Sequence, residues 1–224
     1  MASAVFPSHN EGMAVRVITV GREFGSGGAS IARLLADRLA WRLLDRELLV
    51  EVAKTAHVDP AVCEQFDERC DPWFRGLVRS IWHGTGEWPS GVSDEDLLDS
   101  RILVDLGRRV IEEAARQGEC VIVGRGAQCV LRGRPEVFHV FVYAPLELRK
   151  QRVSERSGPA GAPRPGLEEF VRQNDRARAD YILKYFGQHW CNPHLYDIMI
   201  NSRWGDESTA QAILTAAGLP PTSR

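Results

Sequence analysis

The segment V-R-V-I-T-V-G-R-E-F-G-S-G-G-A-S-I-A, residues 15–32, carries the pattern that decides the fold. Its first six residues are mostly β-branched and favour a strand. A glycine-rich loop follows, and apolar residues then recur at helical spacing from Ile31 to Leu39. A strand, a glycine loop and a helix in this order direct backbone N–H groups and a positive helix terminus towards one point. The segment therefore predicts a phosphate-binding site.

The loop matches a P-loop except at its lysine. The P-loop pattern runs Gly, four variable residues, Gly, Lys and then Ser or Thr. When the loop is laid over the Gly-x-Gly-Lys-x-Thr ending of nucleoside monophosphate kinases, Ser30 takes the place of the magnesium-binding hydroxyl and Gly28 that of the lysine. The candidate phosphate-binding residues are Gly25, Ser26, Gly27, Gly28, Ala29 and Ser30. A strand-to-helix turn with glycines that serve only packing is the alternative interpretation.

Length and charge limit the class of protein. The 224 residues are enough for one substantial core, so we expect a single domain over residues 13–218, with tails at 1–12 and 219–224. The net charge of −2 gives no basic character that would indicate a nucleic-acid partner. No apolar run approaches the roughly 20 residues of a membrane span, and residues 1–12 lack a signal-peptide pattern. We expect a cytoplasmic protein without a nucleic-acid or membrane partner, and the sequence leaves the oligomeric state open.

Strand and helix patterns alternate along the chain. After the first strand and helix, strands are expected at residues 43–44, 120–123, 137–143 and 195–201, and helices at 45–56, 94–117, 146–156, 167–186 and 207–217. The run 120–123 is continuously apolar, as expected for a strand buried on both faces of a parallel sheet. The alternation predicts an α/β fold with a parallel sheet that helices cover on both faces.

Polar residues follow two of these strands. Asp45 and Arg46 come directly after residues 43–44, and Asp45 is either a helix N-cap or part of a ligand site at the rim of the sheet. Arg125 follows residues 120–123 and lies between two glycines. A guanidinium in that position suits bidentate recognition of phosphate or carboxylate, although a surface arginine in a turn gives the same pattern.

Two helical segments with basic residues flank a glycine- and proline-rich tip at residues 157–166. Arg149 and Arg152 are three residues apart and so share one face of the first helix, while Arg172 and Arg176 lie on the second. This arrangement is typical of a lid that excludes water and brings arginines to a transferring phosphoryl group. A helical hairpin with a solvated charged face is the alternative.

Six segments in this order resemble the cytidylate kinase-like family, a branch of the P-loop nucleoside monophosphate kinases. They read I-T-V-G-R-E-F-G-S-G-G-A-S-I-A, L-L-D-R-E-L-L, V-I-V-G-R-G-A, F-V-Y-A-P-L-E-L-R-K-Q-R, R-Q-N-D-R-A-R-A-D-Y-I-L-K-Y-F-G and W-C-N-P-H-L-Y-D-I-M-I-N. The resemblance spans nearly the whole chain. It implies a three-layer P-loop NTPase fold with a parallel core sheet, a helical monophosphate-binding region at about 45–93 and a lid at about 149–184. The missing lysine and Val123, where cytidylate kinases carry an acidic residue, depart from the family pattern.

The resemblance also implies a role for each candidate residue. The loop 25–30 would lie under the ATP phosphates, with Ser30 at Mg²⁺ and Asp45 or Glu23 as a candidate acidic partner of the metal. Asp45 and Arg46 match the start of the monophosphate-binding segment, and Arg125 matches the arginine that holds the acceptor nucleotide. The residues that match the lid are Arg149, Arg152, Arg172 and Arg176, with Asp175.

The implied function is phosphoryl transfer from ATP, with Mg²⁺, to a small acceptor, above all a nucleoside monophosphate such as CMP or dCMP. Because the lysine is missing, we hypothesise that Arg22, or a lid residue such as Arg149, Arg152 or Lys184, supplies its charge. A nucleotide-binding protein without kinase activity and a kinase of a non-nucleotide small molecule remain open. A redox Rossmann enzyme is disfavoured, because the loop lacks the Gly-x-Gly-x-x-Gly spacing.

Overall fold

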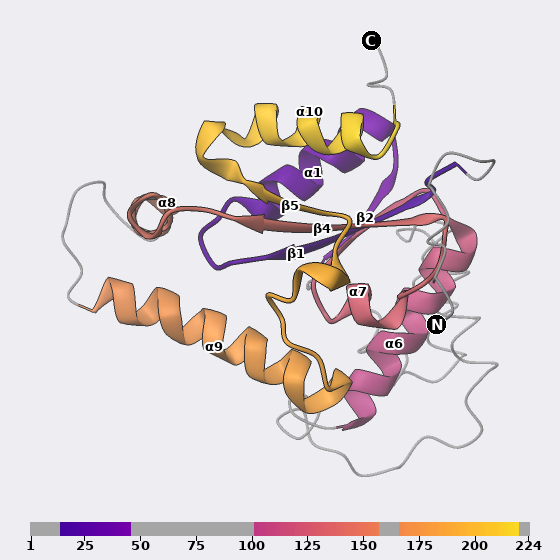
Figure 1. The fold of residues 1–224 in the computed structure, drawn as a ribbon, viewed down its shortest axis with the longest axis horizontal. Coiled ribbons are helices and arrows are strands. Elements are labelled where there is room, and N and C mark those ends of the chain that lie inside the picture. Colours follow the sequence, from indigo (N-terminus) through magenta and orange to yellow (C-terminus); the bar gives the residue numbers. More distant parts are fainter. Residues whose placement is uncertain (1–13, 46–100, 157–165, 220–224) are drawn as a thin grey trace, which may run out of the picture.

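A parallel β-sheet forms the centre of the protein (Figure 1). The structure is a computed structural model that describes residues 14–45, 101–156 and 166–219. Five strands lie within these ranges: β1 (Val17–Arg22), β2 (Arg42–Leu44), β3 (Cys120–Val123), β4 (Val137–Tyr143) and β5 (Ile198–Asn201). Their order is β2-β3-β1-β4-β5, and every neighbouring pair is parallel. The expected parallel sheet is confirmed.

Helices cover both faces of this sheet. They are α1 (Gly28–Leu39), α6 (Arg101–Gln117), α7 (Ala127–Val130), α8 (Leu146–Arg156), α9 (Leu167–Phe186) and α10 (Asp206–Ala216), with two short 3₁₀ turns, η2 (Pro193–Leu195) and η3 (Ser202–Trp204). Helices α1 and α10 pack together on one face, whereas α6, α7 and α9 lie on the other (Figure 1). The fold is therefore the expected three-layer α/β arrangement. None of the described helices is long and apolar enough to cross a membrane.

The apolar core explains why the central strands are mostly hydrophobic. On one face, Ile18 and Val20 of β1 pack against Ile31 and Leu35 of α1 and against residues of α10, and these four side chains are fully buried. On the other face, Phe141 of β4 joins a second cluster that includes Ile182 of α9 and Trp190. A strand covered on both sides buries successive side chains in opposite layers, which favours apolar residues on both faces. Thr19 of β1 and His139 of β4 are buried polar exceptions, and their side chains lie 2.7 Å apart in a hydrogen bond.

The register of the sheet brings two loops to the same edge. Val20 of β1 is paired with Val123 of β3 on one side and with Val140 of β4 on the other. The glycine loop after β1 and the Gly124-Arg125-Gly126 turn after β3 consequently leave the sheet at neighbouring points. In open α/β sheets, ligands bind at this carboxyl edge of the strands.

A few elements differ from the expectation. The last strand begins at Ile198 and not at Leu195, because Pro193 starts the η2 turn and the Asn192 side chain accepts a hydrogen bond from the His194 N–H. The short helix α7 has too few residues to show a helical period and was not expected. The expected acceptor-binding region, apart from Asp45, and the first residues of the expected helix 94–117 lie outside the described residues, as does most of the tip between α8 and α9.

Candidate functional site

The glycine loop and the first turn of α1 present a group of free backbone donors. Within the described part of the chain, no hydrogen bond is made by the backbone N–H groups of Gly25, Gly27, Gly28, Ala29 and Ser30. The first turn of any helix has such unpaired N–H groups, and a glycine loop ahead of it adds more. N–H groups in this arrangement, together with the positive end of the helix dipole, form a binding site for an anion.

Two glycines of the loop are required by conformation and by space. Gly25 and Gly27 have φ values of 79° and 84°, in the left-handed region that other residues rarely adopt. A Cβ atom on Gly25 would lie 2.8 Å from the backbone oxygen of Arg149, and one on Gly27 would lie 2.8 Å from Asp206 Oδ1. Helix α8 therefore excludes a side chain at Gly25 through its backbone, whereas at Gly27 a side chain would displace the ends of Asp206 and Arg152.

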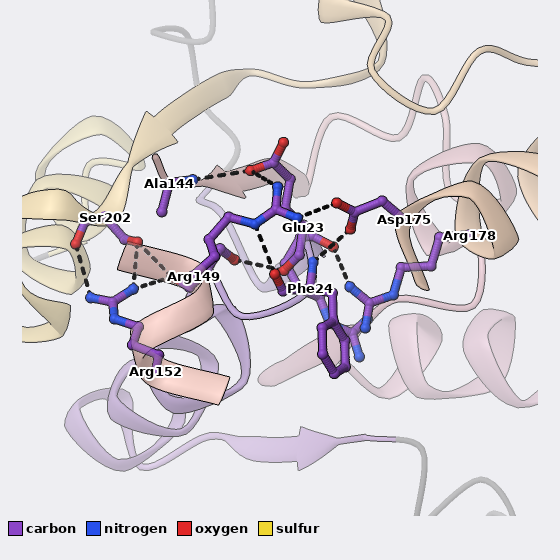
Figure 2. A network of polar contacts seen from close by, with 10 residues as sticks. Glu23, Phe24, Ala144, Arg149, Arg152, Asp175, Arg178 and Ser202 are labelled. Carbon is purple, nitrogen blue, oxygen red and sulfur yellow. Dashed lines mark hydrogen bonds and ion pairs between the residues drawn. The ribbon is translucent and has the colours of Figure 1, made fainter. Parts of the chain in front are cut away.

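Arg149 of α8 holds the loop in this shape. Its guanidinium pairs with Glu23 at 2.9 Å and with Asp175 of α9, and its Nε donates a 2.9 Å hydrogen bond to the Phe24 backbone oxygen (Figure 2). Only 5% of Arg149 is exposed. Glu23 also accepts a hydrogen bond from the Ala144 N–H at 3.1 Å. The charge of Arg149 is thus compensated by two carboxylates of the protein itself.

Arg152, one helical turn further along α8, supports the loop from the side of α10. Its Nη1 donates to Ser202 Oγ at 2.9 Å (Figure 2) and to the Ser26 backbone oxygen at 2.6 Å. Its Nη2 lies 3.4 Å from Asp206 Oδ1. The Ser202 hydroxyl donates to the same Ser26 oxygen. In a regular helix, the Ser30 N–H would donate to the Ser26 oxygen four residues earlier. Here that oxygen accepts from Arg152 and Ser202, and the Ser30 N–H makes no hydrogen bond within the described residues.

A second set of arginines lies at the open edge of the sheet. Burial, followed by the like charges of Arg178 and Arg125, lowers the pKa of Arg22 to about 10, while Asp45 opposes this shift. Arg178 of α9 donates from Nη1 to the Arg22 backbone oxygen at 2.9 Å and lies over the Phe24 ring. Its pKa is also lowered, first by burial. We call Arg22, Arg125 and Arg178 the arginine cluster.

The turn that presents Arg125 has an unusual backbone. Gly124, Arg125 and Gly126 all have positive φ values, of 76°, 55° and 74°. A Cβ on Gly126 would overlap the ring of Phe186 at the end of α9, so glycine is needed there for space as well. On α9, burial raises the pKa of Tyr181 and the charge of Arg125 opposes that shift. The turn thus places the Arg125 guanidinium beside α9.

The remaining predicted residues lie apart from the loop or outside the described chain. Arg172 pairs with Glu168 and Arg176 with Glu169, all on α9 and all largely exposed. Arg46 is outside the described residues. The structure therefore brings Arg149 and Arg152 to the loop, while in this conformation Arg172 and Arg176 form ion pairs along the surface of their own helix.

Ser30 fits the place of a magnesium-binding hydroxyl. It lies in the first turn of α1, it is half-buried, and within the described residues its hydroxyl makes no hydrogen bond. The described residues hold no group of three or more His, Cys, Asp or Glu side chains able to bind a metal.

Sequence reasoning missed part of the loop support. It did not identify Ser202 and Asp206, because they follow the last strand and lie more than 170 residues from Ser26 in sequence. Arg178 was noted only as one of several basic residues of its helix. The sequence shows only that Arg178 is positively charged. A charge alone cannot show that the side chain reaches the Arg22 carbonyl.

Known proteins of similar sequence and fold identify the family of this chain. The cytidylate kinase-like family matches residues 17–203. A cytidylate kinase of Methanopyrus kandleri (strain AV19) is 26% identical over 214 residues, which cover 90% of this chain and 92% of that protein. The crystal structure of an uncharacterized protein from Eubacterium ventriosum ATCC 27560 is similar with a TM-score of 0.64 at 22% identity, covering 90% of this chain and 98% of that one. Since the family match spans well over half of its length, this protein belongs to the cytidylate kinase-like family.

Proposed function

We propose that the protein transfers a phosphoryl group from ATP to a small acceptor, and that the acceptor is a nucleoside monophosphate such as CMP or dCMP. The observation that carries the proposal is the set of five free N–H groups at the glycine loop and the start of α1, beside the arginine cluster. Membership of a kinase-like family supports the reaction class, and the cytidylate kinase of Methanopyrus kandleri supports the choice of acceptor.

The protein's own groups have separate tasks in this reaction. Phosphoryl transfer needs positioning and positive charge around the phosphates, and little covalent chemistry from the protein. The free N–H groups would bind the phosphates of ATP, and Arg149 and Arg152 would keep those donors aligned by holding Phe24 and Ser26 in place. Ser30, together with the phosphates, would hold Mg²⁺, which would supply further neutralisation of charge.

The acceptor would bind at the carboxyl edge next to β3. Arg125 extends from the turn after this strand, and Asp45 follows β2, which is the neighbour of β3 in the sheet. A guanidinium can bind the phosphate of a monophosphate through two parallel hydrogen bonds. Arg172 and Arg176 remain candidates for contacts to the transferring phosphoryl group when a nucleotide is bound.

A coupled ADP-release assay tests this function. Purified protein is supplied with ATP, Mg²⁺ and, in separate reactions, CMP, dCMP, UMP, AMP, GMP or a mixed metabolite pool. We expect turnover that depends on CMP or dCMP. The matched control is Ala29→Glu, because Ala29 is exposed in the first turn of α1 and a carboxylate there repels phosphate while it suits the helix N-terminus. If the Ala29→Glu variant shows the same turnover as wild type, that turnover comes from a contaminating enzyme.

The assay also separates the alternatives. If turnover occurs with the metabolite pool but with none of the nucleotides, the acceptor is a non-nucleotide small molecule and not a nucleoside monophosphate. ATP binding without turnover in any reaction would contradict kinase activity and favour a nucleotide-binding protein in which Gly28 marks the loss of the catalytic lysine.

A further inference from the structure

Gly28 and Arg22 compete for the same space. Gly28 stands where the P-loop pattern has its lysine. A Cβ built on Gly28 would lie 2.5 Å from Arg22 Cβ and 2.9 Å from Arg22 Cγ. Both of these atoms are near the backbone and cannot move aside as the end of a long side chain can. In this conformation, therefore, a lysine at position 28 is incompatible with any residue at position 22 that has a Cβ atom, and an arginine at position 22 requires glycine at position 28.

The Arg22 side chain runs from Gly28 to the turn after β3. A Cβ on Gly124 would overlap Arg22 Nη1, which shows that the end of this side chain lies directly against the Gly124 backbone. The guanidinium thus lies between the start of α1 and the turn that carries Arg125. This is the edge of the sheet at which the free N–H groups of the loop are found.

Two carboxylates neutralise the charge of Arg149, whereas no ion pair within the described residues neutralises that of Arg22. Arg149 is paired with Glu23 and Asp175. For Arg22, the described residues provide no ion pair and no side-chain hydrogen bond. The charge of Asp45 raises the pKa of Arg22, whereas the like charges of Arg178 and Arg125 lower it. A half-buried guanidinium that two like charges repel favours the binding of an anion, which reduces the repulsion.

We infer that Arg22 takes the part of the P-loop lysine on the β- and γ-phosphates of the nucleotide, and that Gly28 is the residue that makes room for it. The positive charge has moved from the start of the helix to the end of the preceding strand. This inference rests on the proposed function only in its choice of a nucleotide as ligand, and it concerns binding, which can be measured without turnover.

Isothermal titration with ADP and Mg²⁺ tests the inference with four variants. We expect Arg22→Ala to weaken ADP binding by about tenfold or more, as the loss of a charge-assisted contact does. In the double variant Arg22→Gly/Gly28→Lys, the Cβ that would collide with the lysine is removed, and affinity should return to within about threefold of wild type. Gly28→Lys alone should bind weakly, because Arg22 still fills the space. Arg116→Ala, an exposed arginine on α6 far from the loop in sequence, is the matched control and should bind as wild type does.

Each result decides the inference. Wild-type affinity in a folded Arg22→Ala protein would overturn it, and so would a folded double variant that binds no better than Arg22→Ala. If Arg22→Ala fails to fold, the double variant alone carries the test, because it keeps a basic side chain in the same space. A protein that binds ADP through Arg22 but phosphorylates no acceptor would retain this inference and contradict the proposed function. Turnover by a protein whose ADP affinity does not depend on Arg22 would support the proposed function and contradict this inference.

Discussion

The backbone N–H of Phe24 donates a 2.7 Å hydrogen bond to Asp175 Oδ1, although the two residues are 151 positions apart. The second oxygen of the same carboxylate is paired with Arg149, which also binds the Phe24 carbonyl (Figure 2). The backbone of one loop residue is thereby held on both sides by α8 and α9 together. If α9 moves as part of a lid, it must first break these bonds and expose a buried charge, so we expect a large motion of this helix to be costly.

Asp175→Ala tests this connection. The change leaves Arg149 with one carboxylate in place of two and removes the acceptor of the Phe24 N–H. We expect the free energy of unfolding to fall by about 3 kcal/mol, since loss of one partner of a buried ion pair typically costs about 3–5 kcal/mol and Glu23 still compensates part of the charge. Urea denaturation measures it. Asp180→Ala, an exposed residue of the same helix, should stay within about 0.5 kcal/mol of wild type. Equal effects of the two variants would contradict the connection.

Arg149→Lys tests whether the shape of the guanidinium matters as well as its charge. A lysine keeps one ion pair but cannot reach two carboxylates and the Phe24 carbonyl at once. We expect a loss of about 1–2 kcal/mol in unfolding free energy, with weaker ADP binding because the loop is less well ordered. Arg116→Lys serves as the exposed control. Unchanged stability and unchanged ADP affinity would mean that charge alone is sufficient at this position.

Arg22→Met tests the repulsion within the arginine cluster. Methionine keeps much of the apolar stem but removes a charge that Arg125 and Arg178 oppose. Without ligand, the variant should unfold at the same temperature as wild type or at a higher one. The rise in melting temperature that ADP produces should become much smaller, because ADP no longer relieves repulsion at Arg22. A variant that is less stable than wild type and yet keeps the full ADP effect would contradict this account.

Arg125→Gln tests the assignment of the acceptor site. Removal of a guanidinium that binds a phosphate should raise KM for the monophosphate about tenfold or more, as expected when a charge-assisted hydrogen bond is lost. The KM for ATP should change by less than about threefold. Initial rates at varied concentrations of each substrate give both constants. A larger effect on ATP than on the acceptor would place Arg125 with the nucleotide donor.

Ser30→Ala tests the proposed place of Mg²⁺. The hydroxyl would bind the metal directly, so its loss should raise the Mg²⁺ concentration needed for half-maximal ADP binding, while ADP without metal should bind about as it does to wild type. Titrations at several Mg²⁺ concentrations measure this without any turnover. Ser208→Ala, an exposed serine on α10, is the control. A metal requirement that does not change would exclude Ser30 as a ligand.

The local patterns were sufficient to predict the fold. The continuous apolar run at β3 and the alternation of strands and helices predicted a parallel sheet with helices on both faces, and helices α8 and α9 begin and end where they were expected. These features depend on burial and helical spacing, which neighbouring residues show directly. The start of β5 was wrong by three residues, because a proline turn interrupts an apolar stretch.

The site could be predicted only as a set of candidates. Glycines at residues 25, 27 and 28 look alike in sequence, yet the first two are required by left-handed conformation and the third by the Arg22 side chain. Likewise, Arg149 and Arg172 are both basic residues of the expected lid, but the first is buried against the loop and the second is exposed in a pair with Glu168. Such differences arise from contacts between residues far apart in the chain.

The most direct test of the account is a crystal structure with ADP and Mg²⁺, in which the distance between the Arg22 guanidinium and the β-phosphate is measured. The account predicts that the β-phosphate lies on the N–H groups of residues 25–30, with a guanidinium nitrogen of Arg22 within about 3.2 Å of a phosphate oxygen. A nucleotide bound away from this loop, or an Arg22 side chain that turns away from a phosphate held there, would contradict it.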